Sequence, residues 1–448
     1  MDYRDALEYL NQVQTLGIKL GLENMSRLLA GMGDPQQAYP AVAVAGTNGK
    51  GSTSAFLASI LRSAGYRTGL YTSPHLVRYE ERIAVDGRPV TEEQLCEALA
   101  ATRDVLESLI ARGQLASHPT HFEILTAAAF HHFRRQRIQV GVLEVGMGGR
   151  MDAVATARTS VAVITNVSLE HTKFLGDTVE EIAAQKAGII REGCYVVTGE
   201  TQPEALAVIR REAQGRGVRV IERHMVAQVT PSRSASTGRF GLVTPRASYG
   251  ELILPLAGRH QVENATLAVL AAEALCEAGA SSGPLSTKAE GFEIPVAAVV
   301  EGLARTHWPG RLQIAGHNPL LLLDGAHNPA GCAALARALR DMREAGAFQR
   351  ICLVLGVLQD KELEPMLRSL LALEPRLVLT RGRSERFRSP DEMAAAARAF
   401  GCPRLVIDDV GAAIETARSW ASPQDAICVC GSLYLVGDAM QALGLSPY

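Results

Sequence analysis

The sequence lacks the features that mark membrane proteins and nucleic-acid-binding proteins. Its 448 residues contain no apolar run of about 18 residues, the length needed for a membrane-spanning helix. Forty-five Lys and Arg stand against 47 Asp and Glu, which leaves a net charge of −2 and no basic excess for nucleic acid or an anionic membrane. The N-terminal stretch has early acidic residues and no apolar signal-peptide core, so we expect a cytoplasmic protein.

Cysteine is scarce and follows no pattern. The eight Cys residues lie scattered in apolar segments, and none of them forms a C-x-x-C pair. No Cys and His spacing matches a zinc site. The sequence therefore predicts buried, reduced thiols.

Short apolar runs alternate with helical patterns along most of the chain. This rhythm predicts a doubly wound parallel sheet, with ligands at the carboxyl ends of its strands. We expect strands at 40–46, 67–73, 138–146, 159–166 and 194–200, and helices at 52–64, 91–112, 121–136 and 178–191. A second series of strands is expected at 319–325, 350–357, 375–381, 404–409 and 426–432.

Other segments depart from this rhythm. The first 25 residues predict an amphipathic helix with Leu7, Leu10 and Val13 on one face. Residues 216–256 predict a small antiparallel sheet, 260–279 a helix and 280–295 an exposed loop. The predicted fold class is α/β: an N-terminal P-loop doubly wound domain (1–306) with that subsheet, a hinge (307–311) and a C-terminal Rossmann-like domain (312–448).

The stretch AGTNGKGST (45–53) stands between a predicted strand and a predicted helix. A standard phosphate loop, G-x-x-x-x-G-K-[ST], would have glycine where Val44 stands and Ser or Thr where Gly51 stands. Backbone N–H groups from Thr47 to Gly51 can still converge on phosphate oxygens, and Lys50 adds a positive charge. The stretch favours nucleotide binding over a plain polar turn.

Polar residues follow the neighbouring strands. Glu144 closes an apolar strand as a Walker-B carboxylate does and is a candidate for Mg²⁺, with a structural ion pair as the alternative. His171, five residues after Asn166, is expected at the same sheet edge and faces a metal or phosphate in this interpretation. Ser73 ends another strand and joins a cation's oxygen shell or caps a helix.

Three further polar residues lie near the predicted hinge. Asn264 opens a helix, while Arg311 and Asp324 stand in WPGRLQ and LDGAHNP. We expect Arg311 and Asp324 to face an interdomain cleft, the common place for substrates between α/β domains. Each residue taken alone also fits a helix cap or an ion pair.

Taken together, these motifs resemble the folylpolyglutamate synthase/dihydrofolate synthase group of the Mur ligase superfamily. The shared motifs, in the family's order, are GTNGKGS, TSPHL, LEVGMGGRMDA, LEHTKFLG, QKAGI, HQVENA, WPGRLQ and DGAHNP. The resemblance spans nearly the whole chain and implies ATP as co-substrate and one or two Mg²⁺ ions.

The resemblance also implies roles for individual residues. ATP contacts fall to Thr47, Asn48, Gly49, Lys50, Gly51, Asn264, Arg311 and Asp324, and Mg²⁺ ligation to Ser73, Glu144 and His171. Lys186 matches a lysine that is carbamylated in the family, and it joins Lys50 and His171 as a catalytic candidate. His327 and Ser432 are candidates for binding glutamate.

A pterin or folate site is implied by three further stretches: Lys19, Leu20, Gly21 and Leu22; Thr120, His121, Phe122 and Glu123; and Met151, Asp152 and Ala153. Phe122 offers a stacking face for a flat heterocycle, with core packing as the alternative. Asp152 can accept hydrogen bonds from a pterin ring. The family continues DATN where this chain has DAVATA, so Val154 and Ala155 replace polar side chains.

The function implied is an ATP-dependent amide ligase with small-molecule substrates: dihydropteroate or folate, L-glutamate and ATP. We expect a monomer that binds neither nucleic acid nor membranes, and both dihydrofolate synthase and folylpolyglutamate synthase activity. The alternatives are a folylpolyglutamate synthase without the first activity, a Mur-type ligase of cell-wall precursors, and a P-loop binding or switch protein. TSPHL and EERI argue against the cell-wall ligase, and the second α/β domain against the switch protein.

Overall fold

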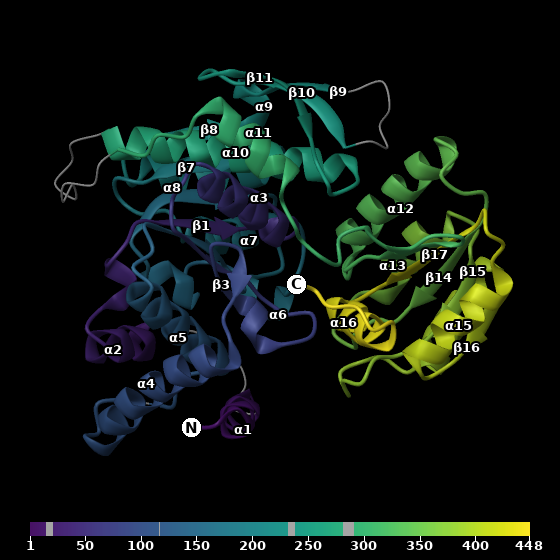
Figure 1. Ribbon diagram of the computed structural model, residues 1–448, viewed down its shortest axis with the longest axis horizontal. Coiled ribbons are helices and arrows are strands. Elements are labelled where there is room, and N and C mark those ends of the chain that lie inside the picture. Colours follow the sequence, from purple (N-terminus) through teal and green to yellow (C-terminus); the bar gives the residue numbers. More distant parts are fainter. Residues whose placement is uncertain (15–20, 116, 232–237, 281–290) are drawn as a thin grey trace.

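The computed structural model describes residues 1–448 except 15–20, 116, 232–237 and 281–290. Two α/β units lie side by side, each built on its own sheet (Figure 1). Within the described residues, no helix is long and apolar enough to cross a membrane. All eight cysteines are free, and all except the partly exposed Cys402 are buried, as the sequence predicts.

The N-terminal unit has an eight-stranded sheet of order β4-β3-β2-β5-β1-β6-β7-β8, parallel from β2 to β8 and antiparallel at β3 and β4. Its strands are β1 (Ala41–Ala45), β2 (Thr68–Tyr71), β3 (Ile83–Val85), β4 (Arg88–Pro89), β5 (Val140–Glu144), β6 (Thr159–Ile164), β7 (Tyr195–Thr198) and β8 (Val220–Glu222). The predicted antiparallel subsheet is confirmed as β9 (Gln228–Pro231), β10 (Arg239–Val243) and β11 (Ser248–Ile253).

Helices cover both faces of this sheet because its central strands are apolar on both sides. In β1, Ala41, Ala43 and Ala45 face one core, and Val42 and Val44 face the other. The first core is closed by α1 (Tyr3–Gln14), α2 (Glu23–Gly31), α4 (Glu92–Ala111), α5 (His121–Arg135), α7 (Val179–Ala187) and α8 (Pro203–Gln214). The second is closed by α3 (Lys50–Ser63), α10 (Arg259–Ala280), α11 (Val296–Ala304) and the subsheet. Short elements are α6 (Thr172–Leu175), α9 (Arg223–Val226) and 3₁₀ turns at Pro35–Gln37, Tyr79–Arg82 and Ala153–Thr156.

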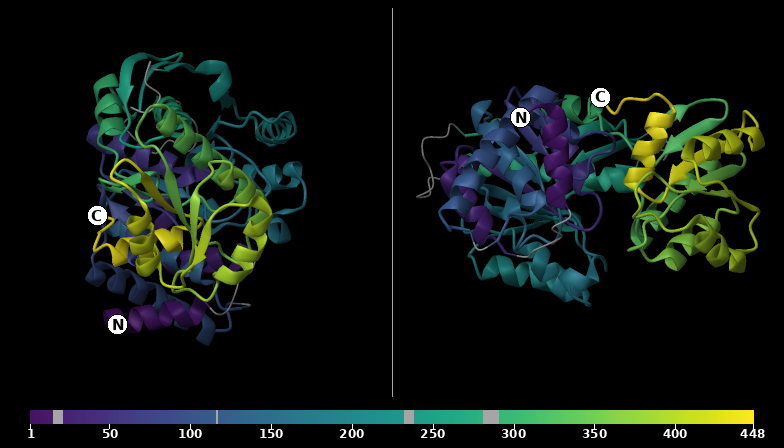
Figure 2. Two further views of the ribbon diagram at one scale, coloured as in Figure 1. Left: turned by 90° about the vertical axis from the view of Figure 1, so that its right-hand side faces the viewer. Right: turned by 90° about the horizontal axis from the view of Figure 1, so that it is seen from below.

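The C-terminal unit has a six-stranded sheet of order β12-β13-β17-β14-β15-β16, in which only the edge strand β12 is antiparallel. The strands are β12 (Gln313–Gly316), β13 (Leu320–Leu323), β14 (Ile351–Leu355), β15 (Arg376–Leu379), β16 (Arg404–Val406) and β17 (Ala426–Cys430). One face packs against α12 (Pro329–Glu344), α13 (Leu363–Leu371) and α14 (Pro390–Ala397), and the other against α15 (Val410–Trp420) and α16 (Leu433–Ala442). A 3₁₀ turn spans Arg398–Phe400. Figure 2 shows this sheet beside the N-terminal unit in two further views.

The predicted α/β class and all ten predicted parallel strands are confirmed, with ends that move by a few residues. The short strands β3, β4 and β12 were not predicted, and β8, which lies in the region of the expected subsheet, instead pairs in parallel with β7 of the main sheet. The N-terminal helix ends at Gln14, a separate helix starts at Glu23, and Ala6 rather than Leu7 is buried beside Leu10 and Val13. The helix expected to reach residue 191 ends at Ala187. Most of the expected loop at 280–295 falls outside the described residues.

The helix α11 sets the position of the linker between the units. A Cβ on Gly302 would lie 2.5 Å from the Cα of Ile60 in α3, so the two helix backbones touch. The carbonyl of Gly302 also accepts from Ser59 Oγ at 2.7 Å and Thr306 Oγ1 at 2.8 Å. The linker therefore starts from a helix that is fixed to the helix following the phosphate loop.

Replacing Gly302 by Ala should destabilise the protein by about 1–3 kcal/mol, because backbone atoms of α3 cannot move aside cheaply. Gly215→Ala is the matched control, since its Cβ would meet nothing closer than 3.5 Å and its φ is −60°. Urea denaturation of both variants checks this expectation. Equal midpoints for Gly302→Ala and the wild type would show that the helix contact is loose.

Candidate active site

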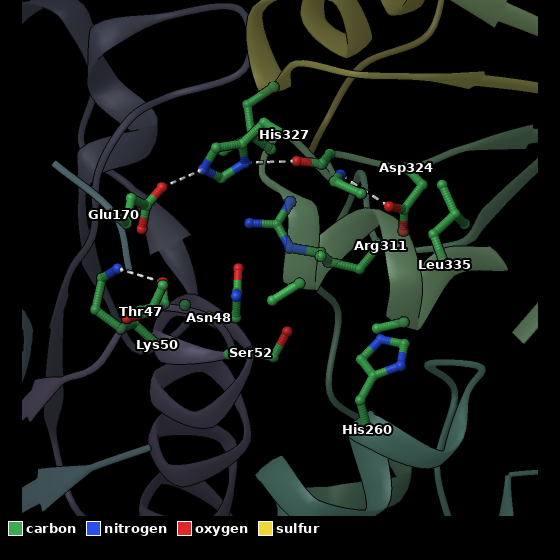
Figure 3. Close-up of a pocket in the computed structure, with 18 of the residues that line it drawn as sticks. Thr47, Asn48, Lys50, Ser52, Glu170, His260, Arg311, Asp324, His327 and Leu335 are labelled. Carbon is green, nitrogen blue, oxygen red and sulfur yellow. Dashed lines mark hydrogen bonds and ion pairs between the residues drawn. The ribbon is translucent and has the colours of Figure 1, made fainter. Parts of the chain in front are cut away.

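A cavity of about 610 Å³ lies between the two units and is lined by residues of both. The structure brings into its wall all of the ATP, metal and glutamate candidates: Thr47, Asn48, Gly49, Lys50, Gly51, Ser73, Glu144, His171, Asn264, Arg311, Asp324, His327 and Ser432. These residues come from positions 47 to 432, so the fold and not the sequence gathers them. Figure 3 shows part of this cavity, with the phosphate loop on one side and Arg311, Asp324 and His327 on the other.

The glycine-rich loop is tied to the segment that follows β6. The backbone N–H of Asn48 donates to Asn166 Oδ1 at 3.0 Å, while its carbonyl accepts from Asn166 Nδ2 at 3.0 Å and Thr165 Oγ1 at 2.7 Å. Thr47 Oγ1 donates to the Ser168 carbonyl and accepts from the Ser168 N–H. The loop backbone is thus fixed from one side, which leaves its other side to the cavity.

Glycine is required in this loop by close contacts. A Cβ on Gly46 would lie 1.8 Å from Thr165 Oγ1, and one on Gly49 would lie 2.3 Å from Asn264 Oδ1. Lys50 opens α3 and bends back so that Nζ donates to the Thr47 carbonyl at 3.2 Å. Its ammonium group therefore lies at the loop itself, where a bound phosphate would accept from it.

Glu144 stands at the end of β5, buried beneath the cavity. Its Oε2 accepts from the Ser73 N–H at 3.1 Å, which places the Ser73 residue beside the carboxylate. Burial raises the pKa of Glu144, and the charges of Lys50 and Arg311 act in the opposite direction. The carboxylate is thus held at the meeting point of two cations and a backbone amide.

His171 occupies the start of the short helix α6 with a left-handed backbone, φ 51°. Its Nε2 lies 3.9 Å from Oε1 of the neighbouring Glu170. Burial lowers the pKa of His171 to about 4, with Lys361 and Lys50 adding to the effect and Glu170 opposing it. The imidazole is therefore neutral at physiological pH and has a lone pair for a cation.

On the opposite wall, Asp324 is already engaged by the backbone. Its Oδ2 accepts from the Leu312 N–H at 2.8 Å and its Oδ1 from the Ala326 N–H at 2.9 Å. These bonds fix the turn after β13 against the linker. Arg311 projects into the cavity from the side of Asp324 (Figure 3). Burial lowers the pKa of its guanidinium, while the charges of Asp324 and Glu144 oppose that shift.

Asn264 lies in the first turns of α10, with its side chain against Gly49 and its Nδ2 donating to Gln261 Oε1 at 3.0 Å. Beside it, Arg259 Nε and Asp341 Oδ2 form an ion pair of 3.1 Å that joins α10 to α12. Small side chains of α12, Ala330, Ala333, Ala334 and Ala338, line this end of the cavity. The cavity therefore runs from the phosphate loop to a slot between α10 and α12.

Lys186 does not line the cavity but is buried in α7 within electrostatic reach of Lys50. Burial lowers the pKa of its amine to about 7, and the charge of Lys50 adds to the effect while Glu170 opposes it. A neutral fraction of this amine therefore exists near pH 7, which an exposed lysine does not provide.

The pterin candidates do not share the walls of this cavity. Phe122 and Asp152 lie behind Gly146, which does line it: a Cβ on Gly146 would be 2.7 Å from the Phe122 ring and 3.3 Å from Asp152 Oδ2. Asp152 accepts from the N–H groups of Met147 and Val154, and burial raises its pKa to about 6. Met151 is exposed, Ala153 is buried, and His121 is partly buried beside Tyr79.

Other members of this set have structural partners. Thr120 and Glu123 bond to each other at the start of α5, with Thr120 N and Oγ1 donating to Glu123 Oε2 at 2.7 and 2.8 Å. This capping box is a role that the sequence analysis did not assign to them. Val154 and Ala155, where the chain departs from the family, are buried in the core. Gly21 and Leu22 precede α2, and Lys19 and Leu20 lie outside the described residues.

Among the residues that line the cavity or bridge it, those that sequence reasoning missed include Glu170, Asn328, Lys361 and Arg386. Glu170 is adjacent to the predicted His171, and Asn328 belongs to the recognised DGAHNP motif. Lys361 follows the strand β14 in the stretch GVLQDKE. Lys361 and Arg386 come several residues after the ends of β14 and β15, so they do not occupy the strand-end positions at which Asp324 and Ser432 stand in the same unit.

Two family descriptions match the chain: the Mur ligase middle domain at residues 44–272, and the Mur ligase glutamate ligase domain at 310–433. The dihydrofolate synthase/folylpolyglutamate synthase of Bacillus subtilis strain 168 is 34% identical over 445 residues, covering 98% of this chain and 99% of the relative. Solved structures agree. Escherichia coli FolC in complex with DHPP and ADP has 29% identity and a TM-score of 0.84, covering 98% of this chain and 97% of that one. Mycobacterium tuberculosis folylpolyglutamate synthase complexed with ADP and AMPPCP has 30% identity and a TM-score of 0.89, covering all of both chains.

The buried amine of Lys186 should leave a pH signature in stability. The folded protein releases this proton near pH 7, whereas the unfolded chain keeps it until near pH 10.5. Between these values the unfolded state binds more protons, so the wild type gains stability with rising pH relative to Lys186→Met, by roughly 2 kcal/mol from pH 7 to pH 9. Well below pH 7 the Lys186 amine is protonated in both the folded and the unfolded protein. The stability difference between the wild type and Lys186→Met then no longer changes with pH.

Urea denaturation in CO₂-free buffers across this range measures the effect. Lys173→Met, which removes an exposed lysine nearby in α6, is the matched control and should follow the wild type. Parallel stability profiles for Lys186→Met and the wild type would contradict a lowered pKa.

Proposed function

This chain belongs to the Mur ligase family, and on that premise we propose that it is an ATP-dependent amide ligase that joins L-glutamate to dihydropteroate and to folates. The observation that carries the proposal is the shared cavity, where a phosphate-binding loop of one unit faces the charged side chains of the other. The relatives named dihydrofolate synthase/folylpolyglutamate synthase support the substrate class, as does the E. coli protein bound to DHPP and ADP.

The reaction has two steps. The carboxylate of the pterin substrate attacks the γ-phosphorus of ATP, which forms an acyl phosphate and releases ADP. The amine of glutamate then attacks the acyl carbon, the C–O bond to phosphate breaks, and inorganic phosphate leaves with the proton of the amine going to solvent or a nearby base. Both steps bring anions together, so the barrier is largely electrostatic.

In this mechanism Lys50 and the loop N–H groups from Thr47 to Gly51 hold the phosphates. Arg311 approaches from the other wall and offsets the charge that gathers on the transferred phosphoryl group. Asp324 accepts from the N–H of Leu312 and so fixes the residue next to Arg311. Asn264, in α10, contacts Gly49 of the loop. The nucleoside part of ATP fits the slot between α10 and α12.

The donor set beside the loop fits Mg²⁺. Glu144 and Ser73 offer oxygen atoms and His171 a neutral nitrogen, next to where the phosphates of ATP would lie. Within the described ranges no group of three or more His, Cys, Asp or Glu side chains is placed to hold a metal ion. Bound there, one or two Mg²⁺ ions would neutralise phosphate charge.

Lys186 fits the modification that the family resemblance implies. A neutral amine adds to CO₂ to give a carbamate with loss of one proton, and the lowered pKa of Lys186 provides that neutral amine near pH 7. The carbamate would change a cation into an anion near Lys50. His327 and Ser432 stand on the C-terminal wall as candidates for the incoming glutamate, and Phe122 with Asp152 behind Gly146 as candidates for the pterin.

We further propose that the enzyme works in the cytoplasm as a monomer. The second candidate function is a folylpolyglutamate synthase without dihydrofolate synthase activity, as named for the Lacticaseibacillus casei relative, which is 32% identical. A cell-wall ligase is a weaker alternative, because similar proteins are named dihydrofolate synthase or folylpolyglutamate synthase.

ADP release by the purified protein should require glutamate together with a pterin acceptor. We expect turnover with both dihydropteroate and tetrahydrofolate. If tetrahydrofolate is turned over in the presence of glutamate and dihydropteroate is not, the monofunctional alternative is supported. ADP release that proceeds at full rate without glutamate would contradict the ligase.

Glu144→Gln should lower kcat by at least about 100-fold and raise the Mg²⁺ concentration needed for half-maximal rate, because the amide keeps the shape and loses the charge. Glu273→Gln is the matched control: Glu273 is also a buried carboxylate, bonded to Tyr249 and Thr244 at 2.6 Å away from the cavity. The control should keep its activity and Mg²⁺ dependence. Near-normal kcat in Glu144→Gln would remove Glu144 from the metal site.

A further inference from the structure

One carboxylate of the N-terminal unit gathers three side chains of the C-terminal unit. Oε1 of Glu170 lies 3.2 Å from Asn328 Nδ2, 3.3 Å from Lys361 Nζ and 3.5 Å from His327 Nε2. The side chains of Glu170 and Lys361 are each only 9% exposed. We call these four residues the Glu170 cluster, and Figure 3 shows its contact between Glu170 and His327 across the cavity.

Asn328 connects this cluster to the phosphate loop. Its Nδ2 also donates to Asn48 Oδ1 at 3.0 Å, and its Oδ1 accepts from the Gly331 N–H at 2.7 Å, which caps the first turn of α12. A single amide side chain therefore contacts the loop, Glu170 and the start of a C-terminal helix. A movement of the C-terminal unit away from the N-terminal unit would therefore break two of these contacts, those of Asn328 with Asn48 and with Glu170.

We propose that Glu170 is a positioning residue, which sets how the C-terminal unit closes over the phosphate loop without touching the reacting atoms. This inference deepens the proposed function and rests on it for the catalytic consequence. The structural consequence, the relative placement of the two units, stands independently of the reaction.

Burial makes the Glu170 contacts strong compared with the other ion pair across the cavity. In the Arg259–Asp341 pair the arginine side chain is 67% exposed, and such solvated pairs contribute little. In the Glu170–Lys361 pair both groups are withdrawn from water, so removing the carboxylate leaves a buried ammonium without its partner. The Glu170 cluster therefore contributes more to the closed arrangement than the Arg259–Asp341 pair does.

Loss of Glu170 should affect the two units unequally. The phosphate loop keeps its bonds to Thr165 and Asn166, so the phosphates of a nucleotide keep their contacts on the N-terminal unit, while the slot between α10 and α12 is disturbed. Lys361 and His327 lose their common anchor, and the wall that carries the glutamate candidates His327 and Ser432 becomes displaced. A misplacement of about 1 Å in such a site can lower the rate by roughly 100-fold.

The test compares Glu170→Ala and Glu170→Gln with Asp360→Asn. Asp360 is the matched control because its Oδ2 lies 3.6 Å from the same Lys361 Nζ, but it belongs to the same unit as Lys361 and is half exposed. Removing it deletes one negative charge beside Lys361 without cutting a link between the units. Circular dichroism and urea midpoints establish that each variant is folded.

Three measurements follow on the full chain: the radius of gyration by small-angle X-ray scattering without ligands, the Kd for ADP by calorimetry, and kcat with KM for glutamate. We expect Glu170→Ala to be more extended than the wild type, with kcat lowered by about 10- to 100-fold, a higher KM for glutamate and a Kd for ADP that rises by a smaller factor than kcat falls. The kcat of Glu170→Gln should lie between those of Glu170→Ala and the wild type, since its amide oxygen still accepts from Asn328. Asp360→Asn should match the wild type.

A double-mutant cycle of Glu170 and Lys361 gives a second line of evidence. Lys361→Gln should also lower kcat, and the double variant Glu170→Gln/Lys361→Gln should lose less than the product of the two single losses, because both changes break the same contact. Independent effects of the two changes would contradict the pairing.

The proposal is overturned if Glu170→Ala keeps the wild-type radius of gyration and KM for glutamate, if Asp360→Asn shows the same losses, or if Glu170→Ala loses ADP affinity as much as rate. If the wild type shows no glutamate-dependent ADP release, the proposed function fails. The scattering comparison then still decides whether Glu170 holds the units together.

Discussion

The hydrogen bonds around Asn48 are the contacts on which the rest of the site depends. Its backbone is held on both sides by Asn166 and Thr165 of the N-terminal unit, and its side chain accepts from Asn328 of the C-terminal unit. The loop is therefore fixed to its own sheet and at the same time forms the seat for the second unit. A ligand bound at this loop lies where the two units meet.

Charge explains why two units are needed. The reaction that we propose brings together a carboxylate, a triphosphate and glutamate, all of them anionic. The N-terminal unit supplies Lys50 at the loop, and the region of the linker and the C-terminal unit supplies Arg311 and Lys361. Each cation lies near a carboxylate of the protein, Glu144, Asp324 or Glu170, so the cavity holds these charges in place before substrates arrive. Such prearranged charges need little reorganisation during the reaction.

Glu170 illustrates how strongly this environment acts. Burial alone would raise the pKa of its carboxyl, but the hydrogen bond and charge of His327, together with Lys50 and Lys361, lower it well below its usual range. The carboxylate thus remains ionised in a poorly solvated place. It is this retained charge, facing Lys361, that links the two units.

The sequence predicted the fold class and most of the cavity because those features are local. Apolar strands followed by polar residues indicate a sheet edge, and the edge brings Lys50, Glu144 and His171 together whatever the connecting helices do. The contact between Glu170 and Lys361 joins residues 191 positions apart and depends on how two separate sheets dock, which no periodicity encodes. Thr120 and Glu123 look polar and available in the sequence, yet they satisfy each other in a helix cap. Phe122 is placed behind Gly146 only by the packing of α5 against the sheet.

The central claim is that the cavity activates a substrate carboxylate by transferring a phosphoryl group to it before glutamate attacks. Dihydropteroate labelled with ¹⁸O in its carboxylate tests this claim most directly, with the inorganic phosphate analysed by mass spectrometry after turnover. The account predicts that each phosphate released carries one ¹⁸O atom, because the oxygen that attacked the γ-phosphorus leaves with it. Phosphate free of label, formed during amide synthesis, would contradict the acyl phosphate and with it the proposed role of the cavity.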